Sequence, residues 1–126
     1  FFSPEERTDI DLLMKRLDNI CTDAANSGVR LMIDAEQSYF QASIDLVANE
    51  LSQKYNKGGA APVVYNTYQM YLKESYEKMR NDLIHAKRQG WSFGAKIVRG
   101  AYMVSERKRA ADLGIPDIIQ DTIQDT

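Results

Sequence analysis

Residues 93–103 of the chain read FGAKIVRGAYM, and this stretch determines how the rest of the sequence is interpreted. Ala95, Ile97 and Val98 form a short apolar run that contains β-branched residues. Runs of this length and composition are typical of strands buried on both faces, as in parallel sheets covered by helices. The stretch therefore predicts a buried strand of a parallel sheet.

Polar residues interrupt and follow this run. Lys96 and Arg99 are cations, and burying a cation costs several kcal/mol, roughly, unless an anion compensates. We therefore expect an anionic or electron-rich group beside them. Gly100 and Ala101 allow a ligand or a backbone to approach closely, and Tyr102 adds an aromatic ring with a hydroxyl. The carboxyl end of a strand is where α/β proteins bind ligands.

Helix and strand patterns alternate along the chain. Apolar residues at three- and four-residue steps, with capping and glycine signals at their ends, predict helices at residues 4–26, 38–56, 69–89 and 105–113. Short β-prone runs predict strands at residues 29–33 and 63–66 and within 93–103. From Asp34 to Asn66 is 32 positions and from Asn66 to Arg99 is 33, so the βα unit has a near-constant length.

Repeated βα units predict parallel strands joined by right-handed crossovers. A (βα)8 barrel takes about 250 residues, and this chain has 126. We therefore expect an α/β fold in which the whole of residues 1–126 is one part of a (βα)8 TIM-like barrel, supplying middle strands, with no internal domain boundary. A free-standing three-stranded α/β domain is the alternative.

Composition excludes several classes of function. The net charge of −2, with cations and anions interspersed, predicts no nucleic-acid partner. The single cysteine, Cys21, lies on the apolar stripe of the first helix, and with one histidine, His85, the chain has no zinc or Cys–His set. We expect no metal site. No apolar run reaches the length of a membrane span and no targeting segment is evident, so any membrane contact or import signal is expected outside these residues.

Polar side chains follow each predicted strand. Residues 34–37, 66–69 and 99–102 read DAEQ, NTYQ and RGAY. The carboxyl ends of parallel strands lie on one edge of a sheet, so these segments would bring a carboxylate, an amide, two cations and a phenol to one pocket. Asp34 is suited to act as a base or to orient an amine. The alternative is that these residues are caps and turn formers, although Ser38 is better placed than Asp34 to cap the second helix.

Three motifs in this order resemble proline dehydrogenase. They are RLMIDAEQ at 30–37, YNTYQ at 65–69 and KIVRGAY at 96–102, and the resemblance extends over most of residues 28–114. It is closest to the mitochondrial enzymes of animals. The resemblance implies a distorted (βα)8 barrel that binds FAD at the carboxyl ends of its strands. It also implies oxidation of L-proline to Δ1-pyrroline-5-carboxylate, a quinone as electron acceptor, and a place on the matrix side of the mitochondrial inner membrane.

The resemblance also implies roles for residues of the first two motifs. Asp34 corresponds to the carboxylate beside the substrate amine, and Ala35 to a residue whose backbone lies against the flavin. Asn66 corresponds to an amide on the edge of the isoalloxazine, a position that is Gln in bacterial members.

The third motif supplies the remaining residues. Lys96 corresponds to a catalytic cation near the reactive flavin nitrogen, and Arg99, Gly100 and Ala101 to further cofactor contacts. Ala101 and Tyr102 correspond to the wall around the proline ring. Bacterial members usually have Arg at the position of Lys96 and Lys at that of Arg99, and Lys lacks the planar fork of Arg.

Two parts of the family site have no counterpart in the sequence: a lysine from an earlier strand and an arginine pair on a late helix, which bind the proline carboxylate. We therefore expect the isolated chain not to turn over proline. Hydroxyproline dehydrogenase fits the same motifs. A non-catalytic βα module that binds a ligand or partner is a further alternative, indicated if Lys96 and Arg99 both point to outer helices or solvent. A structural fragment would associate through its sheet edges.

Overall fold

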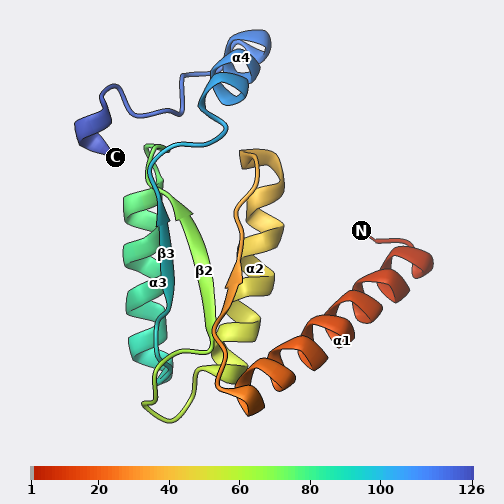
Figure 1. The fold of residues 1–126 in the computed structure, drawn as a ribbon. Coiled ribbons are helices and arrows are strands. Elements are labelled where there is room, and N and C mark those ends of the chain that lie inside the picture. The colour runs from red at the N-terminus through yellow and green to blue at the C-terminus, as the bar shows by residue number, and fades with distance from the viewer. Residues whose placement is uncertain (1) are drawn as a thin grey trace.

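The computed structural model describes residues 2–126, which alternate helices and strands as the sequence pattern predicts (Figure 1). The elements in chain order are α1 (Pro4–Ser27), β1 (Leu31–Ile33), α2 (Ser38–Tyr55), β2 (Val64–Gln69), α3 (Ser75–Gln89), β3 (Ala95–Val98), α4 (Met103–Leu113) and the short 3-10 helix η1 (Ile123–Asp125).

Local sequence signals define the ends of α1. The Ser3 hydroxyl accepts a hydrogen bond from the Glu6 N–H (3.2 Å), and the Glu6 carboxylate accepts one from the Ser3 N–H (2.7 Å), which completes a capping box. Gly28 ends the helix with φ 66°, a left-handed conformation that glycine adopts without a steric penalty. Both ends match the sequence-based prediction.

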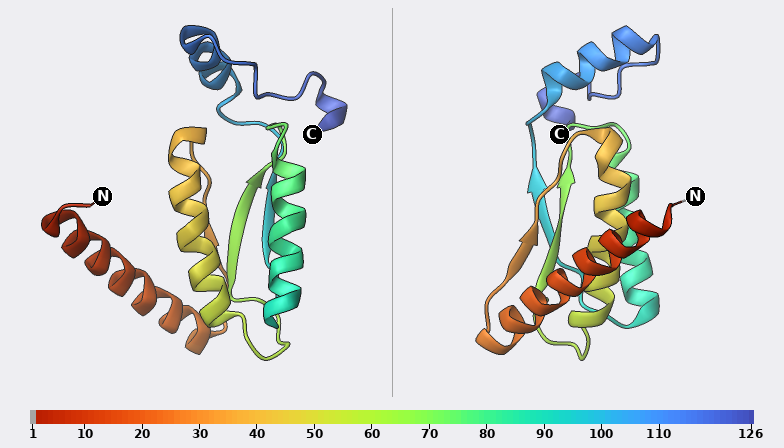
Figure 2. Two further views of the ribbon diagram at one scale, coloured as in Figure 1. Left: turned by 180° about the vertical axis from the view of Figure 1, so that it is seen from behind. Right: turned by 90° about the vertical axis from the view of Figure 1, so that its right-hand side faces the viewer.

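The three strands form one parallel sheet in the order β1-β2-β3. Ile33 pairs with Asn66, Asn66 with Ala95, and Thr67 with Lys96. Helices α2 and α3 lie together on one side of this sheet, and no described element lies over its other side (Figure 2). We call these sides the covered face and the open face. The predicted α/β class with parallel βα units is confirmed.

The main core lies between the covered face and the helices. Cys21 of α1, Leu51 of α2 and Val64 of β2 are at most 2% exposed, and Leu31 and Ile33 of β1 pack against them. The predicted position of Cys21 on an apolar stripe is therefore confirmed. Full burial of side chains of this size contributes about 1.5–3 kcal/mol each to folding.

A second core lies beyond the carboxyl ends of the strands. Leu72 forms an isolated antiparallel bridge with Ile119, and both pack against the buried Tyr71. The sequence after Pro116 lacks periodicity and predicts no regular packing there, but Ile119 is fully buried. A single buried side chain in an irregular segment holds this tail, and such a contact leaves no repeat in the sequence.

The structure corrects the boundary between the second strand and the third helix. Strand β2 runs to Gln69, three residues beyond the predicted end at Asn66, and α3 begins at Ser75 rather than at residue 69. Leu72, which fits the helical spacing, instead packs against the C-terminal tail. The first strand is shorter than predicted and α4 begins two residues earlier, at Met103.

The N-terminal part of helix α1 extends away from the sheet in Figures 1 and 2, whereas Met14, Leu17 and Asp18 in its middle contact the core and α2. The α1 apolar side chains Ile10, Leu13 and Ile20 are 37–49% exposed. Within residues 2–126, strands β1 and β3 each have one unpaired edge. Exposed apolar helix faces and free strand edges are what a section of a larger barrel presents.

Candidate functional site

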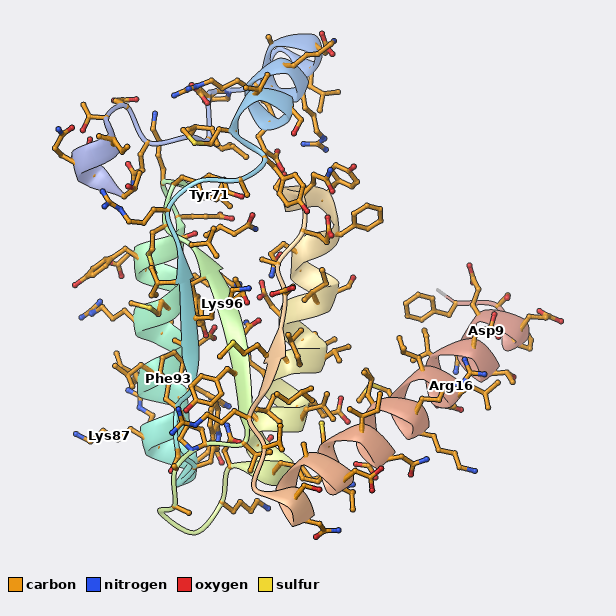
Figure 3. All side chains as sticks on the ribbon, in the orientation of Figure 1. Asp9, Arg16, Tyr71, Lys87, Phe93 and Lys96 are labelled. Carbon is orange, nitrogen blue, oxygen red and sulfur yellow. The ribbon has the colours of Figure 1, made fainter. Side chains whose placement is uncertain are left out.

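The open face carries an ion pair at the strand ends. Asp34 directly follows β1, and its carboxylate accepts a hydrogen bond from the Lys96 ammonium of β3. Lys96, labelled in Figure 3, is the register partner of Thr67, so its pair with Asp34 spans the central strand. The Asp34 side chain is 76% exposed and that of Lys96 36%. An exposed pair of this kind adds at most about 1 kcal/mol to stability, which leaves both charges available to a ligand.

Asn66 lies on the opposite side of the sheet from this pair. Side chains alternate along a strand, and the Asn66 amide donates to Asp45 of α2 (2.9 Å) on the covered face. Its oxygen accepts from the Thr67 N–H (2.9 Å), and the residue is 3% exposed. The prediction that Asn66 ends a strand beside Asp34 is therefore wrong: β2 continues past Asn66, and that position faces the helices.

The polar side chains on the covered face form hydrogen bonds with one another. The Asp45 carboxylate also accepts from Gln41 (2.9 Å) and from the Lys78 ammonium. Burial and the neighbouring Asp82 carboxylate, which accepts from the Tyr68 hydroxyl (2.9 Å), raise the pKa of Tyr68 above its usual range. Because their polar atoms are engaged with one another, these groups serve the packing of α2 and α3 on the sheet.

Arg99, at the end of β3, points to the C-terminal tail. Its guanidinium donates to the Ile123 carbonyl (2.7 Å) and to the carbonyl and hydroxyl oxygens of Thr126 (3.1 and 3.0 Å). The structure thus separates Arg99 from Lys96. A side chain at Gly100 would meet the Met103 sulfur at 3.3 Å, and Ala101 is exposed.

The loops that follow β1 and β3 carry Glu36 and Tyr102. Tyr102 occupies the N-cap position of α4, and the nearby Glu36 carboxylate raises the pKa of the phenol. Ala35 lies half-buried between Asp34 and Glu36. The structure therefore brings together Asp34, Ala35, Lys96 and Tyr102 at one edge of the sheet.

Helix α2 is capped from another part of the chain. The carboxylate of Glu106, a 3% exposed residue of α4, accepts from the N–H and the hydroxyl of Ser38 (2.6 and 2.8 Å). The prediction that Ser38 caps the second helix is wrong, because Gln37 is the N-cap residue and makes no side-chain cap. The Gln41 side chain instead accepts from the Glu36 N–H (2.9 Å).

The sequence pattern gave no individual role to Thr67, Gln69 or Glu106. All three form hydrogen bonds with the backbone between the end of β1 and the start of α2. Thr67 and Gln69 alternate with Asn66 and Tyr68, and that alternation was the signal that β2 continues. No local signal marks Glu106, because its partner Ser38 lies 68 positions away.

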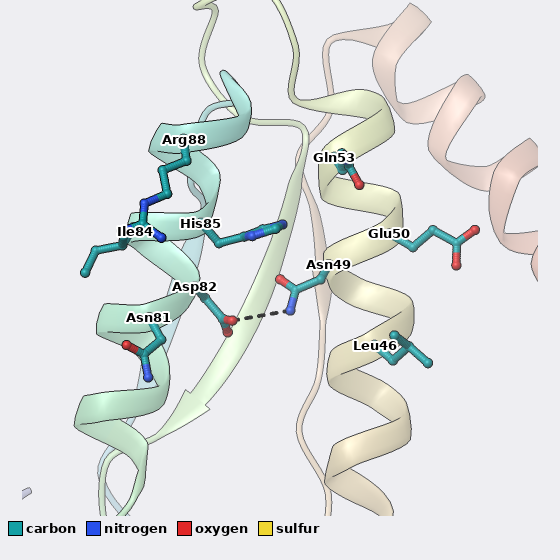
Figure 4. A pocket seen from close by; sticks show the side chains of 9 residues that line it. All are labelled: Leu46, Asn49, Glu50, Gln53, Asn81, Asp82, Ile84, His85 and Arg88. Atoms are coloured by element: carbon teal, nitrogen blue, oxygen red, sulfur yellow. Dashed lines mark hydrogen bonds between the residues drawn. The ribbon is translucent and has the colours of Figure 1, made fainter.

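A groove between α2 and α3 lies away from this site. Its lining includes Asn49 and Asp82, which are hydrogen bonded to one another (3.4 Å), together with Glu50, His85 and Arg88 (Figure 4). The groove lies on the outer, helix side of the sheet and contains none of the predicted site residues. His85 lies in the last turns of α3, as predicted.

Two kinds of feature are absent from residues 2–126. No three His, Cys, Asp or Glu side chains gather as metal ligands in this part of the chain. None of the helices within the same residues combines the length and the apolar character that crossing a membrane requires.

Comparison with known proteins gives a consistent result. The family model described as proline dehydrogenase matches residues 2–126. The chain is 44% identical to human proline dehydrogenase 1, mitochondrial, over 125 residues, and 47% identical to the Drosophila melanogaster protein of the same name over 123 residues. These alignments cover 99% and 98% of this chain but 20% and 18% of the relatives. The chain therefore spans about a fifth of their length.

More distant matches include a cattle protein named hydroxyproline dehydrogenase, 37% identical over 123 residues, which are 97% of this chain and 27% of that protein. A crystal structure of proline utilization A from Bdellovibrio bacteriovorus, inactivated by N-propargylglycine, superposes with a TM-score of 0.78 at 23% identity. The superposition covers 91% of this chain and 12% of that one. It shows that the fold of this chain is one part of a larger barrel-like α/β fold.

Proposed function

The chain belongs to the proline dehydrogenase family, and we propose that it supplies the middle strands of an FAD-dependent enzyme that oxidises L-proline to Δ1-pyrroline-5-carboxylate. One observation carries this proposal: an exposed carboxylate, Asp34, and a partly exposed cation, Lys96, form a pair across the central strand on the face that no described helix covers. By contrast, the Asp45 carboxylate, which pairs with Lys78 under the helices, is 10% exposed.

The chemistry of these residues fits FAD. A reduced flavin is electron-rich, and positive charge stabilises it. Lys96 provides such a charge on the open face. We assign the backbone of Ala35 and the strand-end residues Gly100 and Ala101 to further cofactor contacts on the basis of the motifs. A cofactor contact by Arg99 would require its guanidinium to leave Ile123 and Thr126. When bound, FAD accepts the hydride that leaves the substrate carbon.

Asn66 is not included among the proposed cofactor contacts. Its amide is already bonded to Asp45 and to the Thr67 N–H on the covered face. A side-chain contact with a flavin on the open face would require Asn66 to leave both partners and to cross the sheet.

Asp34 is proposed to bind the substrate amine. Oxidation at the carbon next to nitrogen needs a neutral amine with its lone pair free, and a carboxylate that accepts the N–H hydrogen bond orients that lone pair. Lys96 holds the carboxylate from the other side. Tyr102, whose phenol has a raised pKa, remains a neutral donor at physiological pH and with Ala101 forms the proposed wall of the proline site.

The location and the electron acceptor are part of the same proposal. Relatives from human, fly and nematode are named mitochondrial, and we assign this protein to the same organelle, on the matrix side of the inner membrane. We propose a membrane quinone as acceptor, with any membrane contact made by parts outside this chain.

Turnover by the full-length protein tests the proposal. We expect the purified protein to contain FAD, to reduce an artificial acceptor only when L-proline is added, and to form Δ1-pyrroline-5-carboxylate. A protein without flavin, or one that proline does not reduce, contradicts the proposal. The isolated 126-residue chain is expected to be inactive under the same conditions, and measurable proline-dependent dye reduction by it would contradict that expectation.

Hydroxyproline oxidation is the second candidate, because a protein named hydroxyproline dehydrogenase is 37% identical over 97% of this chain. Comparing kcat/KM for proline and hydroxyproline with the full-length protein distinguishes the two. A higher value for hydroxyproline would reassign the substrate while leaving the proposed roles of Asp34 and Lys96 intact.

A further inference from the structure

Thr67 lies between the two charged residues of the open face. It is the register partner of Lys96, and it lies one position past the pairing of Asn66 with Ile33, level with Asp34. The residue is 2% exposed, and its hydroxyl donates a hydrogen bond to the Ile33 carbonyl (2.7 Å). The peptide unit is planar, so fixing the Ile33 carbonyl also fixes the N–H and the Cα of Asp34.

Gln69 makes an equivalent contact two residues further along the same face. Its amide donates to the Glu36 carbonyl (2.8 Å) and to the Gln41 side chain (3.3 Å), and its oxygen accepts from the Tyr71 hydroxyl. Gln69 is 4% exposed. The contacts with Gln41 and Tyr71 therefore fix the Gln69 side chain that holds the Glu36 carbonyl of the loop.

Together the two side chains bracket a segment of three residues, 34–36. Thr67 holds the Ile33 carbonyl, immediately before Asp34, and Gln69 holds the Glu36 carbonyl at the end of the segment. By contrast, within residues 2–126 the Asp34 carboxylate has one hydrogen-bonded partner, Lys96. The direction of the exposed carboxylate is thus determined mainly by the backbone that Thr67 and Gln69 hold.

We propose that Thr67, supported by Gln69, is a positioning residue that sets the orientation of Asp34 toward the substrate amine. This inference rests on the proposed function. Thr67 does not touch the reacting atoms: it acts through the Ile33 carbonyl. Small misplacements of a group that orients substrate reduce turnover strongly, by roughly 10²-fold for about 1 Å.

The test uses Thr67→Val and Thr67→Ser in the full-length protein. Valine keeps the shape of threonine and removes the hydroxyl, whereas serine keeps the hydroxyl and removes the methyl group. We expect Thr67→Val to lower kcat/KM for proline by at least about tenfold with unchanged FAD content, and Thr67→Ser to retain most of the activity. Amide hydrogen exchange of residues 34–37 should be faster in Thr67→Val and near wild type in Thr67→Ser.

Several results would overturn the inference. These are wild-type activity and exchange in Thr67→Val, an equal loss in both variants, or a loss explained by lower FAD content or a lower Tm. If the wild-type protein does not oxidise proline, the proposed function fails and the catalytic part of the inference fails with it. Hydrogen exchange then still decides separately whether Thr67 holds the Asp34 segment.

Discussion

The two faces of the sheet use polar residues in opposite ways. On the covered face, Asn66, Asp45 and Tyr68 are buried and bonded to one another or to neighbouring helices. On the open face, Asp34 is exposed and Lys96 partly exposed, and their side chains bond to each other and to no other side chain of residues 2–126. Strand β2 serves both faces, because its alternate residues point to opposite sides. Polar character alone therefore does not show whether a side chain is free to meet a ligand, whereas its burial and the face on which it lies do.

The largest effect is expected from Asp34→Asn, which tests the functional role of the open face. In the full-length protein this change should lower kcat/KM for proline by roughly 10²- to 10⁴-fold, the range for losing a positioned polar catalyst. The free energy of unfolding should change by less than about 1 kcal/mol, because the pair is exposed. Steady-state kinetics and urea unfolding provide the two values.

Asp112→Asn is the matched control. Asp112 forms an exposed pair with Lys108 on α4, so the same chemical change is made away from the site. Its activity and stability should be close to wild type. Equal losses in the two variants would contradict the distinction between a site carboxylate and a surface carboxylate.

Asp45→Ala tests the structural role of the covered face. Removing this carboxylate leaves Lys78, Gln41 and Asn66 without their shared acceptor. Lys78 is partly exposed, but leaving the buried amides of Gln41 and Asn66 without their acceptor destabilises by about 1–3 kcal/mol. Urea unfolding of the full-length protein should show this loss. A change as small as that of Asp34→Asn would show that the two faces do not differ as described.

Gly94→Ala tests how closely β2 and β3 approach. A Cβ at residue 94 would lie 2.8 Å from the Val64 carbonyl oxygen and 3.0 Å from the Tyr65 ring. The first contact is with backbone, which cannot rotate away, so we expect a loss of about 1–3 kcal/mol. Thermal unfolding measures it, and an unchanged Tm would contradict the predicted overlap.

The smallest effect is expected at high pH. Burial raises the pKa of Tyr71 to about 12, so the folded state retains the phenol proton more tightly than the unfolded state does. The free energy of unfolding should therefore fall as pH rises from the ordinary tyrosine pKa of about 10 towards 12. Tyr71→Phe should reduce this slope without abolishing it, because the pKa values of Tyr68 and Tyr102 are raised as well. An identical slope in the variant would contradict the prediction.

Much of the fold was predictable because its signals are local. The Ser3 capping box, the glycines after α1 and α3, and the apolar run of β3 each act within a few residues. The end of β2 was not predictable from local signals, since Gln69 and Leu72 also fit a helical spacing. In the structure Gln69 accepts a hydrogen bond from Tyr71, and Leu72 pairs with Ile119, which lies far beyond it in the sequence.

The site was predictable in part for the same reason. Residue type and strand position were sufficient for Asp34 and Lys96, which the structure pairs. They were not sufficient for Asn66, whose direction depends on where β2 ends, or for Arg99, which bonds to the C-terminal tail. Thr67 and Glu106 act through backbone groups far away in the sequence, and a single sequence carries no record of such contacts.

A crystal structure of the full-length protein with FAD and an unreactive proline analogue tests the central claim most directly. We predict the flavin on the open face, beside Lys96, and the analogue's nitrogen within hydrogen-bonding distance of the Asp34 carboxylate. A flavin on the helix-covered face, or an analogue bound without contact to Asp34, would contradict the claim.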